Sequence, residues 1–98
     1  MKFKIQFSDN TKFDIREIWE WYETQRSGLG EEFLSEVEAK ILVIQDNPNL
    51  FQVGFSKVRS TSVERFPYKI AYAVKSDLIF VIGVYHNKRS SKFIRRRK

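Results

Sequence analysis

The chain has 98 residues, a hydrophobic fraction of 42% and a net charge of +6, which fits one domain with a modest core and excludes an intrinsically disordered chain. It contains no cysteine and a single histidine, His86, which excludes disulfides and cysteine-based metal sites, so we expect neither a metal nor a cofactor. Neither a signal peptide nor an apolar run of about 18 residues is present, so we expect a cytoplasmic protein that does not contact membranes.

The first 26 residues predict a strand followed by a helix. Residues 3–7 alternate apolar and polar side chains, as in a half-buried strand. Residues 8–10 offer side-chain oxygens that can cap a helix running to about Gln25. Trp21 lies off the apolar stripe of this helix, so it is either partly buried or in contact with a partner. The stripe consists of Ile15, Ile18, Trp19 and Tyr22.

A second helix is predicted after a glycine-rich connector. Residues 27–30 (Ser-Gly-Leu-Gly) end the first helix, and Glu31 and Glu32 suit the positive end of the next helix dipole. Residues 47–49 (Asn-Pro-Asn) end the second helix. The two helices should therefore form an antiparallel hairpin. The apolar stripe of the second helix consists of Phe33, Val37, Ile41 and Ile44, with Leu34 alongside.

Three strands are predicted in the C-terminal half, where the apolar period changes to two. A polar strand begins at about Phe55 and lies near an edge or a working surface. Pro67 marks the start of an alternating strand over residues 68–74. Residues 75–77 form a tight turn, and residues 78–85 are almost continuously apolar, which is typical of a strand covered on both faces.

The order of elements, βααβββ, predicts an α+β domain in which a helical hairpin packs on a sheet. Residues 1–98 are interpreted as one domain with a basic tail from about residue 87 to residue 98. Residues 1–56 hold six Lys/Arg and ten Asp/Glu (net −4), and residues 57–98 hold twelve and two (net +10). Such a field attracts polyanions or acidic protein segments, but a solvated charged surface is the alternative.

The candidate site residues are the basic groups of the predicted strands. If the three strands pair, Arg59, Arg65 and Lys69 can converge with His86 and Arg89 on one concave side of the sheet. Cations there could hold phosphates, and His86 could act as an acid or a base. In the alternative, His86 is a strand-end residue with an ordinary hydrogen bond, and the tail that holds Arg95 is a disordered arm.

Other chemistries are not supported by the pattern. The segment Gly28-Leu29-Gly30 follows a helix and is too short for a nucleotide-binding loop. One histidine and the lack of a convincing nucleophile argue against a catalytic triad. The pairs Glu17/Glu20 and Glu32/Glu36 fall on predicted solvent faces and are interpreted as surface charge.

Ordered segments of the chain resemble the ParE/RelE-type toxins of bacterial type II toxin–antitoxin (TA) systems, the plasmid stabilisation protein family. They are Val58-Arg59, residues 65–74, and residues 79–84 leading to His86 and Arg89. The Gln-x-x-Gly-Leu-Gly connector between the predicted helices also matches the family pattern, so the resemblance covers nearly the whole chain. It implies two helices on a four-stranded, mainly antiparallel sheet. It also implies a toxin that inhibits growth, with a cognate antitoxin from the adjacent gene as partner.

The family divides by target, and the chain resembles its ParE-like members more closely. RelE-like members cut mRNA on the ribosome, whereas ParE-like members poison DNA gyrase. Lys69 stands where RelE-like toxins carry a catalytic arginine, and the tail has Phe93 and no tyrosine. Arg89 does match a basic position of the nuclease group. Residues 66–68 (Phe-Pro-Tyr) and His86 follow the ParE-like pattern.

The resemblance therefore favours a toxin that inhibits gyrase. Two alternatives stay open: a ribosome-dependent mRNA endoribonuclease of the RelE type, and a non-toxic basic module that binds nucleic acid. No catalytic residue is assigned, and the candidates are His86, Arg89 and Lys69. The candidate target- or phosphate-binding residues are Arg59, Arg65, Lys69, Arg89 and Arg95.

Overall fold

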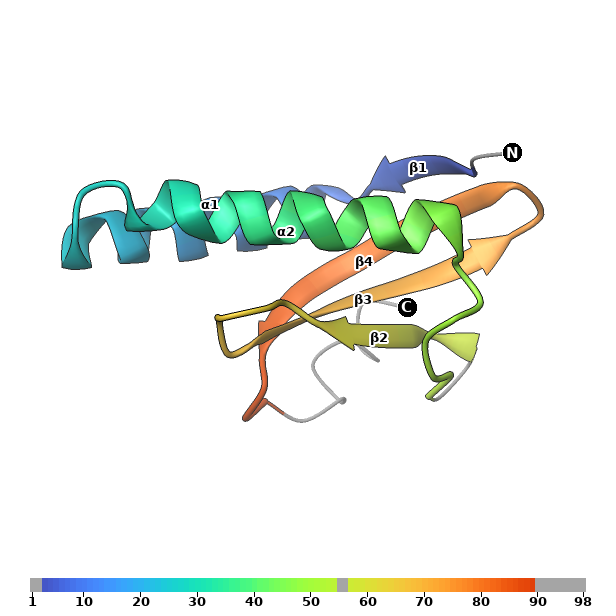
Figure 1. Cartoon of the computed structure of the whole chain (residues 1–98). Coiled ribbons are helices and arrows are strands. Elements are labelled where there is room, and N and C mark those ends of the chain that lie inside the picture. Colours follow the sequence, from blue (N-terminus) through green and yellow to red (C-terminus); the bar gives the residue numbers. More distant parts are fainter. Residues whose placement is uncertain (1–2, 55–56, 90–98) are drawn as a thin grey trace.

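The computed structural model describes residues 3–54 and 57–89; Arg95 and most of the predicted basic tail lie outside the described residues. Helices α1 (Asp9–Gln25) and α2 (Leu29–Asp46) form an antiparallel hairpin on one face of a four-stranded sheet (Figure 1). The strands are β1 (Lys4–Phe7), β2 (Arg59–Ser62), β3 (Tyr68–Lys75) and β4 (Leu78–His86). The predicted βααβββ order and α+β class are confirmed. In the described part of the chain, no helix has the length and apolar character needed to cross a membrane.

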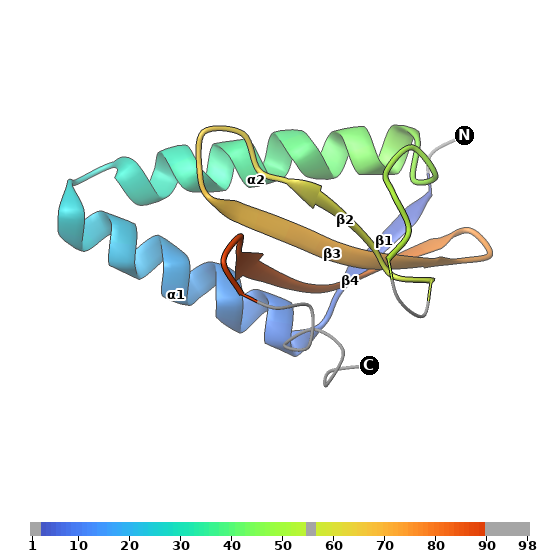
Figure 2. The same ribbon diagram turned by 90° about the horizontal axis from the view of Figure 1, so that it is seen from below.

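The sheet is mixed, with the strand order β1-β4-β3-β2. β1 runs parallel to β4, and β3 is antiparallel to both β4 and β2 (Figure 2). The predicted polar strand is shorter than expected, because it begins at Arg59 and not near residue 55. Lys57 has a φ of 63°, and this left-handed conformation cannot continue a strand.

The main core lies between the hairpin and the sheet. Both predicted helical stripes contribute to it, since Ile18, Tyr22, Phe33, Val37 and Ile44 are buried. At one end of this core, aromatic rings interlock with centroid separations between 5.0 and 6.3 Å. Edge-to-face contacts of this kind add to the stabilisation that comes from burial. The rings belong to Tyr22, Phe33, Phe66 and Tyr68.

β4 contains a β-bulge. Ala71 pairs with Gly83 and Tyr72 pairs with Val81, so Ile82 is an extra residue on this strand. β1 pairs with β4 only as far as Val81. The backbone of β4 beyond this point therefore needs other hydrogen-bond partners on that edge.

The start of α1 supplies these partners. Ser8, Thr11 and Asp14 are spaced three residues apart and so lie on one face of the helix. Their side chains bond to three backbone groups of β4, which fixes α1 beside the end of that strand. The bonds are Ser8 Oγ to Ile82 O at 3.1 Å, Thr11 Oγ1 to Val81 O at 2.9 Å and Val84 N to Asp14 Oδ2 at 3.0 Å.

Candidate functional site

A cleft of about 330 Å³ lies where the end of β4 and the start of β3 meet α1. The β-strand side of this cleft is basic and aromatic, and the helix side is acidic and apolar. The side chains that line it are Phe13, Asp14, Glu17 and Ile18 from α1 and Tyr68, Val84, Tyr85, His86 and Arg89 from the strands and the turn after β4. Two of the predicted site residues, His86 and Arg89, are therefore together.

The turn after β4 places Arg89 beside His86. The Lys88 backbone N donates to His86 Nδ1 at 3.0 Å, and the Arg89 backbone N donates to the His86 carbonyl oxygen at 2.9 Å. Because Nδ1 accepts this bond, the neutral imidazole carries its proton on Nε2. The ring also stacks edge-on against Tyr68, with centroids 5.3 Å apart. His86 thus makes the local strand-end hydrogen bond that was the alternative to a catalytic role, and it also lines the cleft.

Tyr68 forms the floor of the cleft beside these residues. Burial raises the pKa of the Tyr68 phenol, and the positive charge of Arg89 offsets part of this rise. The hydroxyl therefore stays protonated at neutral pH and can donate a hydrogen bond to a ligand. Tyr68 supplies a neutral donor next to the cationic Arg89.

The acidic side of the cleft was not predicted from the sequence. Glu64, in the turn between β2 and β3, pairs with Lys40 Nζ at 2.9 Å and does not line the cleft. Asp14 and Glu17 are the acids that line the cleft. The signal for Asp14 was its spacing after Ser8 and Thr11, which places three polar side chains on a helix face that packs against the sheet.

Arg59 does not reach this cleft. Its cross-strand partner is Tyr72, and the Arg59 guanidinium donates to the carbonyl oxygens of Asn49 at 3.3 Å and Phe51 at 2.6 Å. The Tyr72 hydroxyl donates to the Pro48 carbonyl oxygen at 2.7 Å in the same region. Arg59 and Tyr72 together fix the segment that leads from α2 to the sheet.

Arg65 is bound to carboxylates of α2. It has a φ of 70° in the turn before β3, and its guanidinium nitrogens lie 2.8 Å from Glu32 Oε1 and 3.2 Å from Glu36 Oε2. Hydrogen bonds from Arg65 and Arg26 lower the pKa of the Glu32 carboxyl group. Glu32 and Glu36 are therefore surface charges, as predicted, and both hold Arg65 to the hairpin.

Lys69 lies on the opposite face of the sheet from His86. Its partners across the two ladders are Ser62 and Tyr85, whereas His86 pairs with Tyr68. Because successive strand residues point to opposite faces, Lys69 and His86 diverge. The predicted convergence of all five basic residues on one side of the sheet was therefore wrong, and the pair that the structure brings together is His86 and Arg89.

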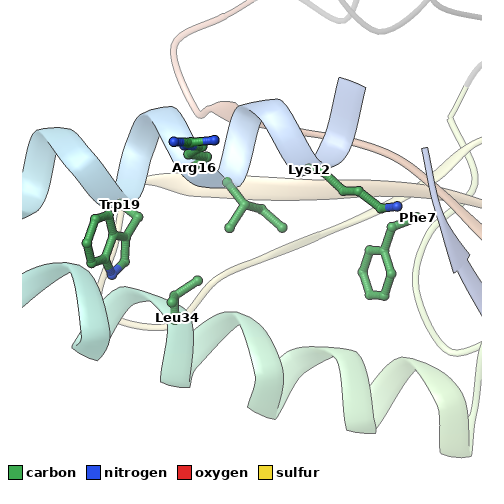
Figure 3. A pocket seen from close by; sticks show the side chains of 6 residues that line it. Phe7, Lys12, Arg16, Trp19 and Leu34 are labelled. Carbon is green, nitrogen blue, oxygen red and sulfur yellow. The ribbon is translucent and has the colours of Figure 1, made fainter. Parts of the chain in front are cut away.

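A second hollow lies between the two helices. It is apolar and measures about 490 Å³, and an adjoining hollow of about 510 Å³ continues along α2 to Leu42. Lys12 and Arg16 stand at its α1 side (Figure 3). Ile15 and Trp19 of the predicted stripe face this groove and are only partly buried. The groove is lined by Phe7, Ile15, Trp19, Leu34, Val37, Ile41 and Leu42, together with Lys12 and Arg16 on its α1 side and Glu38 of α2.

Comparisons with known proteins agree with this architecture. Neither a protein-family model nor a curated protein matches the sequence. A chain of the chromosomal ParDE TA system from P. aeruginosa is 15% identical, with a TM-score of 0.77 over 87% of this chain and 96% of that one. A mutant of the E. coli toxin RelE in the free state is 16% identical, with a TM-score of 0.72 and coverage of 95% and 92%. The isolated E. coli RelE toxin is 18% identical, with a TM-score of 0.62 and coverage of 96% and 97%. The chain has the α+β fold of these ParE/RelE-type structures.

Proposed function

We propose that this chain is a toxin of a type II TA pair, which inhibits bacterial growth and is neutralised by a cognate antitoxin from the adjacent gene. The observation that carries this proposal is the fold, which is shared with the ParDE and RelE structures over at least 87% of this chain. The basic C-terminal half, with a net charge of +10 from twelve Lys/Arg and two Asp/Glu, supports a partner with an acidic segment. A cytoplasmic location belongs to the same proposal.

The apolar groove between α1 and α2 is the surface we assign to the antitoxin. Its lining is aliphatic and aromatic, and Lys12 and Arg16 stand at its α1 side. An amphipathic helix fits such a groove with its apolar face, and acidic residues on its flank would meet the two basic side chains. The groove therefore gives a more specific expectation for the antitoxin than the excess of positive charge alone.

For the target we propose DNA gyrase, with mRNA on the ribosome as the alternative. RNA cleavage without a metal needs an acid, a base and several cations around one phosphate. Arg59 and Arg65 are bonded to acceptors of the protein itself, and Lys69 lies on the other face of the sheet. This arrangement supports binding of a partner at His86 and Arg89 more than phosphodiester cleavage.

Expression of the chain alone in bacteria tests the proposal. We expect growth arrest that the adjacent gene relieves, and we expect the purified protein to inhibit gyrase supercoiling. Primer extension on translated mRNA should show no new cuts. Normal growth despite soluble, folded protein would refute the toxin assignment. Codon-phased cuts that disappear in the His86→Ala variant, with supercoiling unaffected, would move the chain to the nuclease alternative.

A further inference from the structure

Two exposed aromatic side chains on α1 are not used by the fold. Phe13 is 61% exposed and Trp21 is 57% exposed. They are eight residues apart, with Glu17 midway, so all three lie along one stripe of the helix. We call Phe13, Glu17 and Trp21 the α1 stripe. It is separate from the stripe that packs into the core and explains why Trp21 did not fit that pattern.

The α1 stripe borders the cleft that holds His86 and Arg89. Phe13 and Glu17 line this cleft directly, and Trp21 continues the stripe one helical turn further. Trp21 stands edge-on against Tyr22, with ring centroids 5.1 Å apart, and Tyr22 in turn packs against Tyr68. The exposed ring of Trp21 is therefore supported from below by the aromatic core, so a partner would meet a surface that is already ordered.

The composition of this surface is that of a protein interface. Tryptophan, tyrosine and arginine are the residues that most often dominate binding energy between proteins, and the α1 stripe and the cleft combine Trp21, Tyr68 and Arg89.

The charges at this surface disfavour a nucleic acid. Binding of a single strand relies on a continuous positive groove that follows the phosphates, with aromatic side chains for the bases. Here Asp14 and Glu17 line the same cleft as Arg89, so a phosphate chain bound in the cleft would lie near two negative charges. A protein segment can match both signs at once.

We propose that the α1 stripe, together with Arg89, is the surface that docks the protein target of the toxin. The matching segment presents apolar side chains to Phe13 and Trp21, a carboxylate to Arg89 and a hydrogen-bond donor to Glu17. This inference rests on the proposed function and adds to it a target-binding surface that is distinct from the groove assigned to the antitoxin.

Substitutions on exposed side chains test this surface without disturbing the core. The variants are Phe13→Ser and Trp21→Ser, and the matched control is Leu50→Ser, because Leu50 is 59% exposed and lines neither the cleft nor the groove. Each protein is measured for binding to purified gyrase holoenzyme, to a single-stranded RNA oligonucleotide and to the antitoxin. We expect each stripe variant to lose gyrase affinity by about tenfold or more, with antitoxin affinity unchanged and the control within about twofold of wild type.

A charge-reversal variant at Glu17 tests whether the α1 stripe binds a protein or a nucleic acid. Glu17→Lys reverses one of the two acidic charges that line the cleft, so we expect gyrase affinity to fall and RNA affinity to rise. If instead the stripe variants lose RNA affinity and keep gyrase affinity, the surface stacks bases and the proposal is overturned. Loss of antitoxin affinity alone would assign the stripe to the antitoxin and also overturn it.

The outcomes for the toxin and for the surface can be told apart. A wild-type chain that neither arrests growth nor binds the antitoxin refutes the toxin function. In that case, gyrase binding that depends on Trp21 still supports the docking surface, and the absence of gyrase binding overturns it.

Discussion

The arginines of this chain illustrate two different uses of the same side chain. Arg59 and Arg65 are bonded to carbonyl and carboxylate oxygens of the protein, where they tie a loop and a turn to the rest of the fold. Arg89 lines a cleft beside His86. All three looked alike in the sequence as cations on or near strands. The difference teaches that the tertiary surroundings of a cation, and not its place in a basic segment, decide whether it lines a cleft.

The largest effect is expected at the cleft. Arg89→Ala should weaken inhibition of gyrase supercoiling by about tenfold or more, as for an interface residue that dominates binding. Arg65→Ala is the matched control, since it removes a guanidinium that contacts Glu32 and Glu36. If both variants lose inhibition equally, the distinction between the two kinds of arginine fails.

The acidic wall of the cleft should matter for stability. Asp14→Ala leaves the buried N–H of Val84 without its acceptor, which we expect to cost about 1–3 kcal/mol of unfolding free energy. Asp14→Asn keeps an amide oxygen that can accept the same hydrogen bond and should recover most of this loss. Urea unfolding of the wild type, the alanine variant and the asparagine variant measures these differences in unfolding free energy. Equal losses in the alanine and asparagine variants would mean that the charge of Asp14, and not its hydrogen bond, fixes α1 to β4.

Arg59 should contribute through the shape of its guanidinium. Arg59→Met removes the hydrogen bonds to the Asn49 and Phe51 carbonyl oxygens, with an expected cost of about 1–2 kcal/mol for bonds from a charged donor. Both bonds are donated by Nη1 of Arg59; Arg59→Lys keeps the charge but does not place its nitrogen at the end of an equally long planar group, so it should stay well below wild type in urea unfolding. A lysine variant as stable as wild type would show that position 59 needs only a positive charge.

The smallest effect is expected at the exposed Arg65 network, and it should depend on pH. Hydrogen bonds from Arg65 and then Arg26 lower the pKa of Glu32 in the folded protein. The network therefore stabilises the fold at pH values above the ordinary glutamate pKa of about 4.3, and this stabilisation is lost as the pH falls through the lowered pKa. Arg65→Gln should be less stable than wild type at neutral pH and equal to it at strongly acidic pH. A difference that does not change with pH would contradict the network.

Local periodicity was enough to predict most of the fold. The structure has four of the predicted local features. They are the i, i+3, i+4 stripe of α1, the end of α1 near Gln25, the end of α2 at residues 47–49 and the turn at residues 75–77. These features depend on neighbours within a few residues, because helix and strand periods are fixed by backbone geometry. The order of elements then limited the architecture to a hairpin on a sheet.

The candidate site was decided by contacts that are distant in the sequence. Alternation shows which residues of one strand share a face, but it does not show which face meets the helices, so Lys69 and His86 could not be separated in advance. The bulge at Ile82 changes the register of β4, and Asp14 finds its partner Val84 70 residues away. The sequence by itself determined the elements and the excess of positive charge. Only tertiary packing determined that the acids of α2 bind Arg65, that loop carbonyl oxygens accept from Arg59, and that His86 and Arg89 line one cleft.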